Sequence, residues 1–495
     1  KYWDVLIFNY LRDRNIVIPQ KRKSDKAEKF EGAYVKEPQV GMHKWVMSFD
    51  LNSLYPHLIM QYNISPETVN KDLRQVKNMS VEKLLTQDTD MSGMHQRGLT
   101  MTPNGALFKT GKKGFLSEMM ETMYNDRVKY KKLMLQSKQQ YENTKEPKLL
   151  KDISKYNNIQ MAKKISLNSA YGAIGNQYFR YYDLLIAEGI TTAGQLSIRW
   201  IENKVNQYMN KLLDTDNKDY VIASDTDSIY VTFDKLVEKF NPKNTVNFLD
   251  TIAKEKLEPF IDKSYQELAD YTNAYAQKMQ MKREVIADKG IWVAKKRYIL
   301  NTHDVEGVRY KKPKLKIMGV EAVKSSTPAA CREKIKDALK IIMNEDSKVL
   351  NSFIQDFRKD FMNLKPEMVA YPRSVNGLNK WTESHNLFKK GAPIHVKGAI
   401  LYNHLVKDKK LQGKYPYIQE GDKIKFLHMK TPNTYQSTSI SFMTKLPEEL
   451  NLNNFVNYEM QFEKSFVEPL KFITDIINWQ IDGSYGTQGT LEDFF

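Results

Sequence analysis

The feature that most constrains this chain is the stretch Tyr220–Val231, in which two apolar, β-branched runs flank a short polar centre. That pattern predicts a strand, a tight turn and a second strand. The turn holds Asp225 and Asp227 two positions apart. Two like charges about 4 Å apart repel by roughly 4 kcal/mol at an effective dielectric near 20, and a hard cation such as Mg²⁺ would remove that repulsion. The alternative is a surface hairpin, because Asp and Ser are common in turns.

Size and charge narrow the classes of protein to consider. The 495 residues suffice for about three domains, and apolar and charged contents of 41% and 27% indicate a globular protein. The formal net charge of +17 favours a polyanionic partner. No run approaches about eighteen apolar residues and no signal peptide is recognisable, so we expect no membrane association and a cytoplasmic location. A single cysteine, Cys331, excludes an internal disulfide.

Periodicity places the main elements. Helical patterns cover 1–20, 115–141, 151–172, 184–213, 247–280 and 325–364, and strand patterns cover 34–36, 45–49, 290–300 and 310–318. The polar stretch 70–105 is expected to be irregular with one short helix. The break at Glu146-Pro147 predicts that the helices before and after it form an antiparallel helical hairpin.

Another acidic residue, Asp50, follows an apolar strand in the segment Ser48–Pro56. We expect a helix to begin near Pro56, with first backbone N–H groups suited to phosphate oxygens. Asp50 and Asp227, from distant segments, would bracket two metal ions in an arrangement that serves in-line phosphoryl displacement. The alternative is that Asp50 is only a helix N-cap.

Cationic side chains follow on the predicted hairpin. Lys164, Asn168 and Tyr171 share one helix face, and Arg127 and Lys131 lie one turn apart on the other helix. Cations from two helices that face a common cleft would clamp a triphosphate. The alternative for any one of these cations is a position on an ordinary solvent-exposed helix face. Tyr171-Gly172, however, is an unusual sequence for such a face.

Basic and aromatic residues interleave again in Lys295–Tyr298 and in 311–316. This composition on strands suits the backbone of a nucleic acid duplex. The alternative is a charged edge strand that prevents aggregation. Glu284, shortly before, is a candidate third carboxylate near the metal ions.

Three ordered segments, Asp50–Pro56, Lys164–Gly172 and Ser224–Ser228, resemble the polymerase motifs of family B DNA polymerases, particularly those of the replicative enzymes of T-even-type bacteriophages. Supporting stretches extend the resemblance over essentially the whole chain: 63–68, 179–183, 295–298, 313–319 and 325–328. The resemblance implies a DNA-directed DNA polymerase, a nucleotidyltransferase of DNA replication.

The fold that it implies is α+β, a right-hand polymerase core with an antiparallel palm sheet, helical-hairpin fingers and a mostly helical thumb. The boundaries we expect are 1–21 for an amino-terminal helix or linker, 22–113 and 177–319 for the palm, 114–176 for the fingers and 320–495 for the thumb.

The resemblance also implies roles for individual residues. Two Mg²⁺ ions, for which Mn²⁺ could substitute, would be held by Asp50, Asp227 and the Leu51 carbonyl, with Asp225 tuning the site. The residues expected to contact the deoxynucleoside triphosphate are Ser53, Leu54, Tyr55, Arg127, Lys131, Lys164, Asn168 and Tyr171. Among them Tyr55 would exclude a 2′-hydroxyl, and Lys164 would act in catalysis.

Primer–template DNA would be contacted by Lys295, Lys296, Arg297, Tyr298 and Asp304, with Lys296 near the primer end and counted among the catalytic residues. A carboxy-terminal tail containing Leu491, Phe494 and Phe495 would bind a sliding clamp; its alternative is a frayed terminus.

Several departures from the family pattern bear on these expectations. His57 stands where a small polar residue is usual, Asn52 where Thr is, and Ala170 where a bulkier residue is. Fewer than fifty residues precede Asp50, without the acidic pairs of a proofreading exonuclease, and the chain does not begin with Met. We therefore expect no proofreading by this chain alone. It could be half of a split phage polymerase, with a separate exonuclease chain as partner, or a shortened chain.

Two other functions stay open at this stage. One is a polymerase with a different template or sugar preference, against which Tyr55 argues. The other is a non-catalytic DNA-binding subunit with decayed motifs, against which the intact acidic and cationic positions argue.

Overall fold

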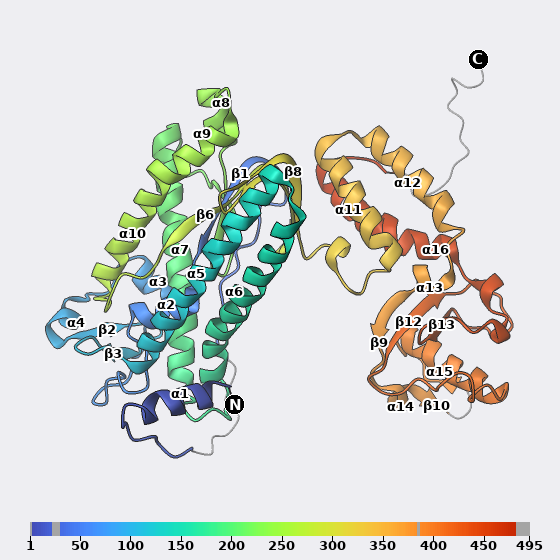
Figure 1. The fold of residues 1–495 in the computed structure, drawn as a ribbon, viewed down its shortest axis with the longest axis horizontal. Helices are drawn as coiled ribbons and strands as arrows, with labels where there is room; N and C mark the ends of the chain where they lie inside the picture. Colours follow the sequence, from blue (N-terminus) through green and yellow to red (C-terminus); the bar gives the residue numbers. More distant parts are fainter. Residues whose placement is uncertain (1, 22–29, 384–386, 482–495) are drawn as a thin grey trace. The chain divides into compact units, whose positions relative to one another are not determined.

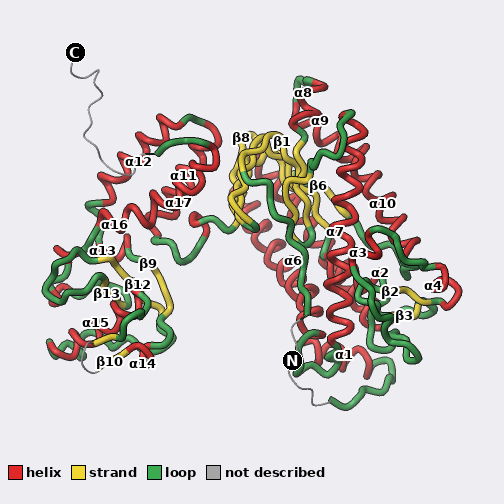
Figure 2. Tube along the Cα trace, turned by 180° about the vertical axis from the view of Figure 1, so that it is seen from behind, coloured by secondary structure: helices red, strands yellow, loops and turns green. Residues whose placement is uncertain are grey.

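The computed structural model describes residues 2–21, 30–383 and 387–481, which divide into two compact units (Figures 1 and 2). The amino-terminal unit contains the chain as far as Gln39, His43–Gly290 and Leu300–Lys314. The carboxy-terminal unit contains Val40–Met42, Ile291–Ile299 and the chain from Leu315. No helix within these described ranges is long and apolar enough to cross a membrane.

A six-stranded sheet with the order β4-β5-β1-β6-β7-β8 carries the acidic segments. Its strands are β1 (Gly41–Leu51), β4 (Val221–Asp225), β5 (Ser228–Thr232), β6 (Met281–Ala294), β7 (Arg297–Val305) and β8 (Val308–Met318). The hairpin predicted at 220–231 is confirmed as β4 and β5. Strand β5 pairs antiparallel with both β4 and β1, and its Ser228 lies opposite Asp225 on one side and Asp50 on the other.

Two strand predictions are wrong in detail. Residues 34–36 form no strand, because only Val35 makes a bridge, to Asp225. The stretch expected as one strand at 290–300 holds the end of β6 and the start of β7, separated by a turn in which Lys296 takes a left-handed conformation with φ 59°. A left-handed residue ends the regular pleat and reverses the chain.

Two long helices, α5 (Phe115–Thr144) and α6 (Pro147–Ile174), confirm the predicted hairpin and lie side by side. The turn between them is short because Lys145 caps α5 in a left-handed conformation and Pro147 occupies the first turn of α6. Helix α7 (Leu184–Leu213) begins at an Asp183 cap that accepts hydrogen bonds from two backbone N–H groups.

The remaining elements of the amino-terminal unit are α1 (Tyr2–Arg12), α2 (Leu54–Gln61), α3 (Val81–Leu85), α4 (Ser92–Arg97), β2 (Leu99–Met101), β3 (Leu107–Lys109), α8 (Asp234–Phe240), α9 (Thr245–Ile252), a π-helical turn (Ala253–Leu257) and α10 (Glu258–Tyr271). Helix α1 ends at Arg12 rather than near Pro19, since Asn15 turns the chain with φ 54°. The stretch 70–105 holds two short helices and a strand instead of one helix.

The carboxy-terminal unit mixes helices with small sheets. Its elements are α11 (Ala329–Asn344), α12 (Ser347–Phe361), α13 (Pro366–Val369), β9 (Tyr371–Ser374), α14 (Leu378–Trp381), β10 (Thr382–Glu383), β11 (Leu387–Phe388), α15 (Ile394–Asp408), β12 (Lys423–His428), β13 (Ser439–Phe442), α16 (Tyr458–Phe462) and α17 (Glu468–Thr474). Strands β13, β12 and β9 form an antiparallel sheet. Phe357, Phe361, Phe462 and Phe466 pack ring against ring in the core.

Candidate active site

The sheet register brings Asp50 and Asp227 together from segments far apart in the chain. Asp50 lies at the end of β1 opposite Ser228, and the Leu51 backbone N–H donates to the Asp227 carbonyl over 2.7 Å. The β4–β5 turn is tight, because Thr226 adopts φ 60° and the Asp227 N–H returns to the Asp225 carbonyl over 2.6 Å. Both predicted acids therefore lie at the same end of the adjacent strands β1 and β5.

Burial and mutual repulsion dominate the electrostatics of this pair. Burial raises the pKa of the Asp50 carboxyl well above its usual range, and the neighbouring charges of Asp227 and Glu284 raise it further. The pKa of Asp227 is also raised, again mainly by burial. The cation of Lys164 opposes both shifts. The positive charge of Lys164 does not outweigh burial and repulsion, so the pKa values of both carboxyls stay raised, which is a condition that a bound cation relieves.

Glu284 lies on β6 beside this pair, where its Oε2 accepts from the Ser48 hydroxyl over 3.3 Å. No group of three His, Cys, Asp or Glu side chains in the described ranges is close enough to hold an ion together. The structure therefore does not gather Glu284 with the two acids into one ligand set. Two carboxylates still fit Mg²⁺, which is usually held by one or two carboxylates plus waters and substrate phosphates. The Leu51 carbonyl belongs to the residue that directly follows Asp50.

Helix α2 begins shortly after Asp50 in the chain. Its N-cap is Ser53, in a left-handed conformation with φ 47°, so the alternative that Asp50 caps the helix is wrong. The Tyr55 ring lies 4.7 Å from the Tyr171 ring of α6, centroid to centroid. Helix α7 packs closely against the Tyr55 ring, because a Cβ at Gly194 would come within 3.3 Å of that ring.

The cationic residues predicted on the hairpin face the same region. Arg127 is buried at 6% exposure and donates to the Ser53 hydroxyl over 2.5 Å, and its Nε has no hydrogen-bond partner among the described residues. Burial lowers the pKa of its guanidinium. Lys164 and Asn168 are exposed on α6, and Lys164 makes no ion pair with any described residue. These side chains retain donors that an anionic ligand could use.

Lys131 differs from the other cations because it is already paired, with Glu306 in the β7–β8 turn. The charges of Lys131 and Glu306 act on Asp50 and Arg127 respectively, so both lie near the acidic pair and the buried guanidinium. Sequence reasoning missed Glu306. Nothing near Glu306 in the sequence points to this contact, because its partner Lys131 lies 175 positions away.

Asp304 is buried at 1% exposure within an ion network. Its two oxygens accept from Arg283 and Arg309, and one also accepts from the Gly307 N–H over 3.0 Å. These contacts hold the β7–β8 turn that carries Glu306. We therefore interpret Asp304 as a positioning residue, since a buried, paired carboxylate cannot reach DNA.

The basic segment Lys295–Tyr298 belongs to the carboxy-terminal unit. Lys295 and Lys296 are exposed, whereas Arg297 forms a two-pronged contact with Glu321 at 3.0 Å. Tyr298 is 5% exposed and stacks on Trp292 with centroids 5.5 Å apart, so its ring serves the core. The expected clamp-binding residues Leu491, Phe494 and Phe495 lie outside the described residues.

The residues that depart from the expected motifs are accommodated by packing. His57 is buried, its Nδ1 lies 3.0 Å from the Ser53 carbonyl oxygen and its ring meets Tyr124 edge to face. Burial lowers the pKa of His57 to about 4, so the ring is neutral near pH 7. Asn52 donates its N–H to the Gln280 carbonyl, and Ala170 lies in the core.

These features define a class of protein with two half-buried acids at the same end of adjacent strands and a cation-bearing helical hairpin beside them. The chain belongs to DNA polymerase family B, whose family model matches residues 4–476. It is 34% identical to the DNA-directed DNA polymerase of Escherichia phage RB69 and 33% identical to that of Enterobacteria phage T4, over 100% and 95% of this chain. The chain is also 26% identical to a DNA polymerase 1 of Pyrococcus abyssi, over 67% of this chain. The chain spans only 60% and 58% of the two phage polymerases.

Proposed function

We propose that this chain is a DNA-directed DNA polymerase that extends a primer with deoxynucleoside triphosphates by phosphoryl transfer. The observation that carries the proposal is the half-buried, repelling pair Asp50 and Asp227, with the charges of Arg127 and Lys164 on the hairpin close enough to act on them. Membership in family B supports it. In this proposal α5 and α6 are the fingers, the six-stranded sheet belongs to the palm, and the chain from 320 is the thumb.

Each residue has a defined task in this proposal. Asp50, Asp227 and the Leu51 carbonyl would hold two Mg²⁺ ions, which activate the primer hydroxyl and neutralise the leaving pyrophosphate. Asp225, at the base of the turn, would tune that coordination. Arg127 already donates to Ser53 at the start of α2 and would direct its Nε, which has no partner in the described ranges, to a phosphate oxygen.

Lys164 and Lys131 would neutralise the remaining phosphate charge, with Ser53 and Leu54 supplying contacts at the start of α2. Tyr55 would lie beneath the sugar, where its ring, fixed between Tyr171 and α7, leaves no room for a 2′-hydroxyl. Asn168 and Tyr171 would line the new base pair. Lys295, Lys296 and Arg297 would contact the primer–template backbone.

The test is single-nucleotide primer extension by Asp227→Asn, an isosteric change that removes one charge. We expect extension to fall by at least about a thousandfold with DNA binding retained. The control is Asp216→Asn, which removes a charge from an exposed residue outside the site. Full extension by Asp227→Asn would refute the assignment. DNA binding without extension by the unaltered chain would instead favour a non-catalytic subunit.

The wider setting is also part of the proposal. The carboxy-terminal tail would bind a sliding clamp, and a separate exonuclease-bearing chain would be a partner of this one. The protein would act in a replisome in the host cytoplasm. Co-purification of an exonuclease-bearing chain from the native source would test the partner.

A further inference from the structure

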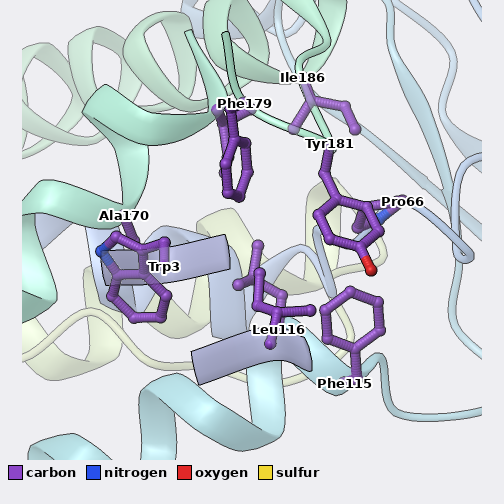
Figure 3. Close-up of a pocket in the computed structure, with 10 residues that line it drawn as sticks. Trp3, Pro66, Phe115, Leu116, Ala170, Phe179, Tyr181 and Ile186 are labelled. Atoms are coloured by element: carbon purple, nitrogen blue, oxygen red, sulfur yellow. The ribbon is translucent and has the colours of Figure 1, made fainter. Parts of the chain in front are cut away.

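The base of the hairpin formed by α5 and α6 contains a small apolar pocket (Figure 3). The pocket has a volume of about 10 Å³ and lies between α1, the first residues of α5 and the last turns of α6. Trp3 and Ala170 lie on one side of it, and Phe115 and Tyr181 lie on the other. Because this space is not filled by side chains, the ends of the two helices can shift slightly against α1 without a clash.

A small shift at the base becomes a large one at the far end of the hairpin, around residues 142–147. Helix α6 has 28 residues, so the hairpin is about 42 Å long at about 1.5 Å per residue. A tilt of about 5° at the base would therefore move the far end by about 4 Å. Arg127 and Lys164, whose charges act on the acidic pair, would move over part of that distance. The position of these cations thus depends on what holds the far end.

Polar contacts with strand β8 hold the far end of the hairpin (Figure 1). The side-chain oxygen of Gln139 on α5 accepts from the Arg309 backbone N–H of β8 over 3.1 Å. Closer to the tip, the Glu142 carboxylate is paired with the Lys314 ammonium, also of β8. These contacts join the end of α5 to the sheet that carries the acidic pair.

Glu142 is the buried member of the ion pair at the tip. Its side chain is 9% exposed and accepts from Lys314 and from Lys145, the latter over 2.6 Å. Burial raises the pKa of the Glu142 carboxyl, but the hydrogen bonds from the two lysines outweigh burial and leave that pKa below its usual value. The Lys314 ammonium also lies 4.2 Å from the centre of the Tyr310 ring. A buried, ionised carboxylate is costly without its cations, so this pair favours one position of the hairpin.

The contact between Lys131 and Glu306 also joins α5 to the sheet, but it lies in the proposed nucleotide site. In the proposed function a triphosphate would compete with Glu306 for Lys131. Glu142 lies eleven positions beyond Lys131, about 16 Å further along the helix axis. A nucleotide that reaches Lys131 therefore leaves the pair at the tip intact.

We propose that Glu142 and Lys314 are positioning residues, whose ion pair holds the far end of the hairpin on β8 and so keeps Arg127 and Lys164 near the acidic pair. The effect on nucleotide binding rests on the proposed function, whereas the holding of the hairpin does not. The competing interpretation is that Lys314 belongs to the cationic stretch 311–316 and serves DNA alone. Loss of the Glu142 charge would then leave the hairpin where it is.

The first measurement follows the position of the hairpin in the full chain without nucleotide. Spin labels are attached at two exposed positions, Gln140→Cys near the tip of α5 and Asp216→Cys after α7, and their separation is measured by double electron–electron resonance. The single natural cysteine, Cys331, is buried and so protected from labelling. The test variants are Glu142→Gln and Lys314→Met, which remove one charge from either side of the pair.

The unaltered chain is expected to show one narrow distribution of distances. Both test variants should broaden or shift it by about 4 Å, and the double variant should add nothing, because each change breaks the same contact. The matched control is Lys145→Met, which removes the other cation of Glu142 but lies at the end of α5 itself and does not reach the sheet. This control should keep the narrow distribution, as should Lys314→Arg, which retains the cation.

The second measurement is single-nucleotide incorporation at saturating primer–template. The KM for the nucleotide should rise by about fivefold in both test variants with kcat little changed, because a hairpin that spends less time in the binding position lowers the apparent affinity in proportion. Fivefold is about what an ion pair with one exposed member can supply. The control Lys145→Met should keep the KM of the unaltered chain. Thermal unfolding of all variants checks that folding is unchanged.

Three results would overturn the inference. The first is an unchanged distance distribution in both test variants. The second is an effect of Lys314→Met that Glu142→Gln does not share, which would assign Lys314 to DNA. The third is an equal effect of Lys145→Met, because the contact with the sheet would then not be the cause. If the distances change while KM does not, the link to nucleotide binding fails. If the distances change and the unaltered chain never extends a primer, the proposed function fails and the holding of the hairpin stands.

Discussion

Replacing Glu306 by glutamine tests how a triphosphate would reach Lys131. In the structure the Lys131 ammonium is paired with Glu306, and their side chains are 26% and 29% exposed. A partly exposed pair of this kind contributes at most about 1 kcal/mol. If Lys131 must leave Glu306 to bind a phosphate, that energy opposes nucleotide binding and corresponds to about fivefold in the binding constant.

We therefore expect Glu306→Gln to lower the KM for the incoming nucleotide by up to about fivefold, with kcat little changed, in steady-state single-nucleotide incorporation. The matched control is Glu121→Gln, which changes a carboxylate on α5, the helix that also carries Lys131. Glu121 is 33% exposed and pairs with Lys113 and Lys278, none of which belongs to the proposed site. The control should leave KM unchanged. A KM that rises in Glu306→Gln would refute the competition, because Glu306 would then hold Lys131 in its productive position.

Three further predictions concern pH, the ion network and sugar selection. The pKa of His57 is lowered to about 4 in the folded state. The free energy of unfolding should therefore fall by up to about 3 kcal/mol as pH drops from about 6.5 to about 4. Urea unfolding should show that this loss is smaller in His57→Gln. Asp304→Asn should destabilise by about 3 kcal/mol, since Arg283 and Arg309 lose a buried anionic partner, and an unchanged urea midpoint would contradict the positioning role. Tyr55→Ala should raise ribonucleotide incorporation at least about tenfold in competition assays, and no gain would remove the steric argument.

Local patterns predict those parts of the fold that local physics decides. The helical hairpin and α7 follow from strong periodicity and capping residues, and β4 and β5 follow from alternating apolar runs around an acidic turn. The errors fall where single residues take left-handed conformations. Asn15 ends α1 early, and Lys296 turns what reads as one strand into a junction between two. Such conformations depend on tertiary contacts, as at Gly319, where a Cβ would come within 2.3 Å of the Lys296 carbonyl.

Site residues were predictable from the sequence where they belong to a recognisable sequence motif. Asp50, Asp227, Arg127 and Lys164 stand in recognisable segments, and the structure brings them to one region of the amino-terminal unit. Glu306 was not predictable, because its importance arises from a lysine on another element. Burial also distinguishes cations that look alike in the sequence, because Arg127 is buried whereas Lys164 is exposed.

Cations that line one surface groove of the amino-terminal unit illustrate the same limit. Lys71, Arg97, Lys109 and Lys112 are spread over loops and short elements without any charge run, so only the folded chain shows that they share one surface. Net charge alone indicated a polyanion somewhere on the protein and could not say where.

The central claim is that Asp50 and Asp227 together bind divalent ions at the site of phosphoryl transfer. Electron paramagnetic resonance of Mn²⁺, titrated into the full chain with primer–template and an incoming nucleotide, measures this directly. The proposed arrangement predicts about two bound ions in the unaltered chain and loss of at least one in Asp50→Asn and in Asp227→Asn, while Asp216→Asn keeps both. Equal Mn²⁺ binding by all four proteins would contradict the claim.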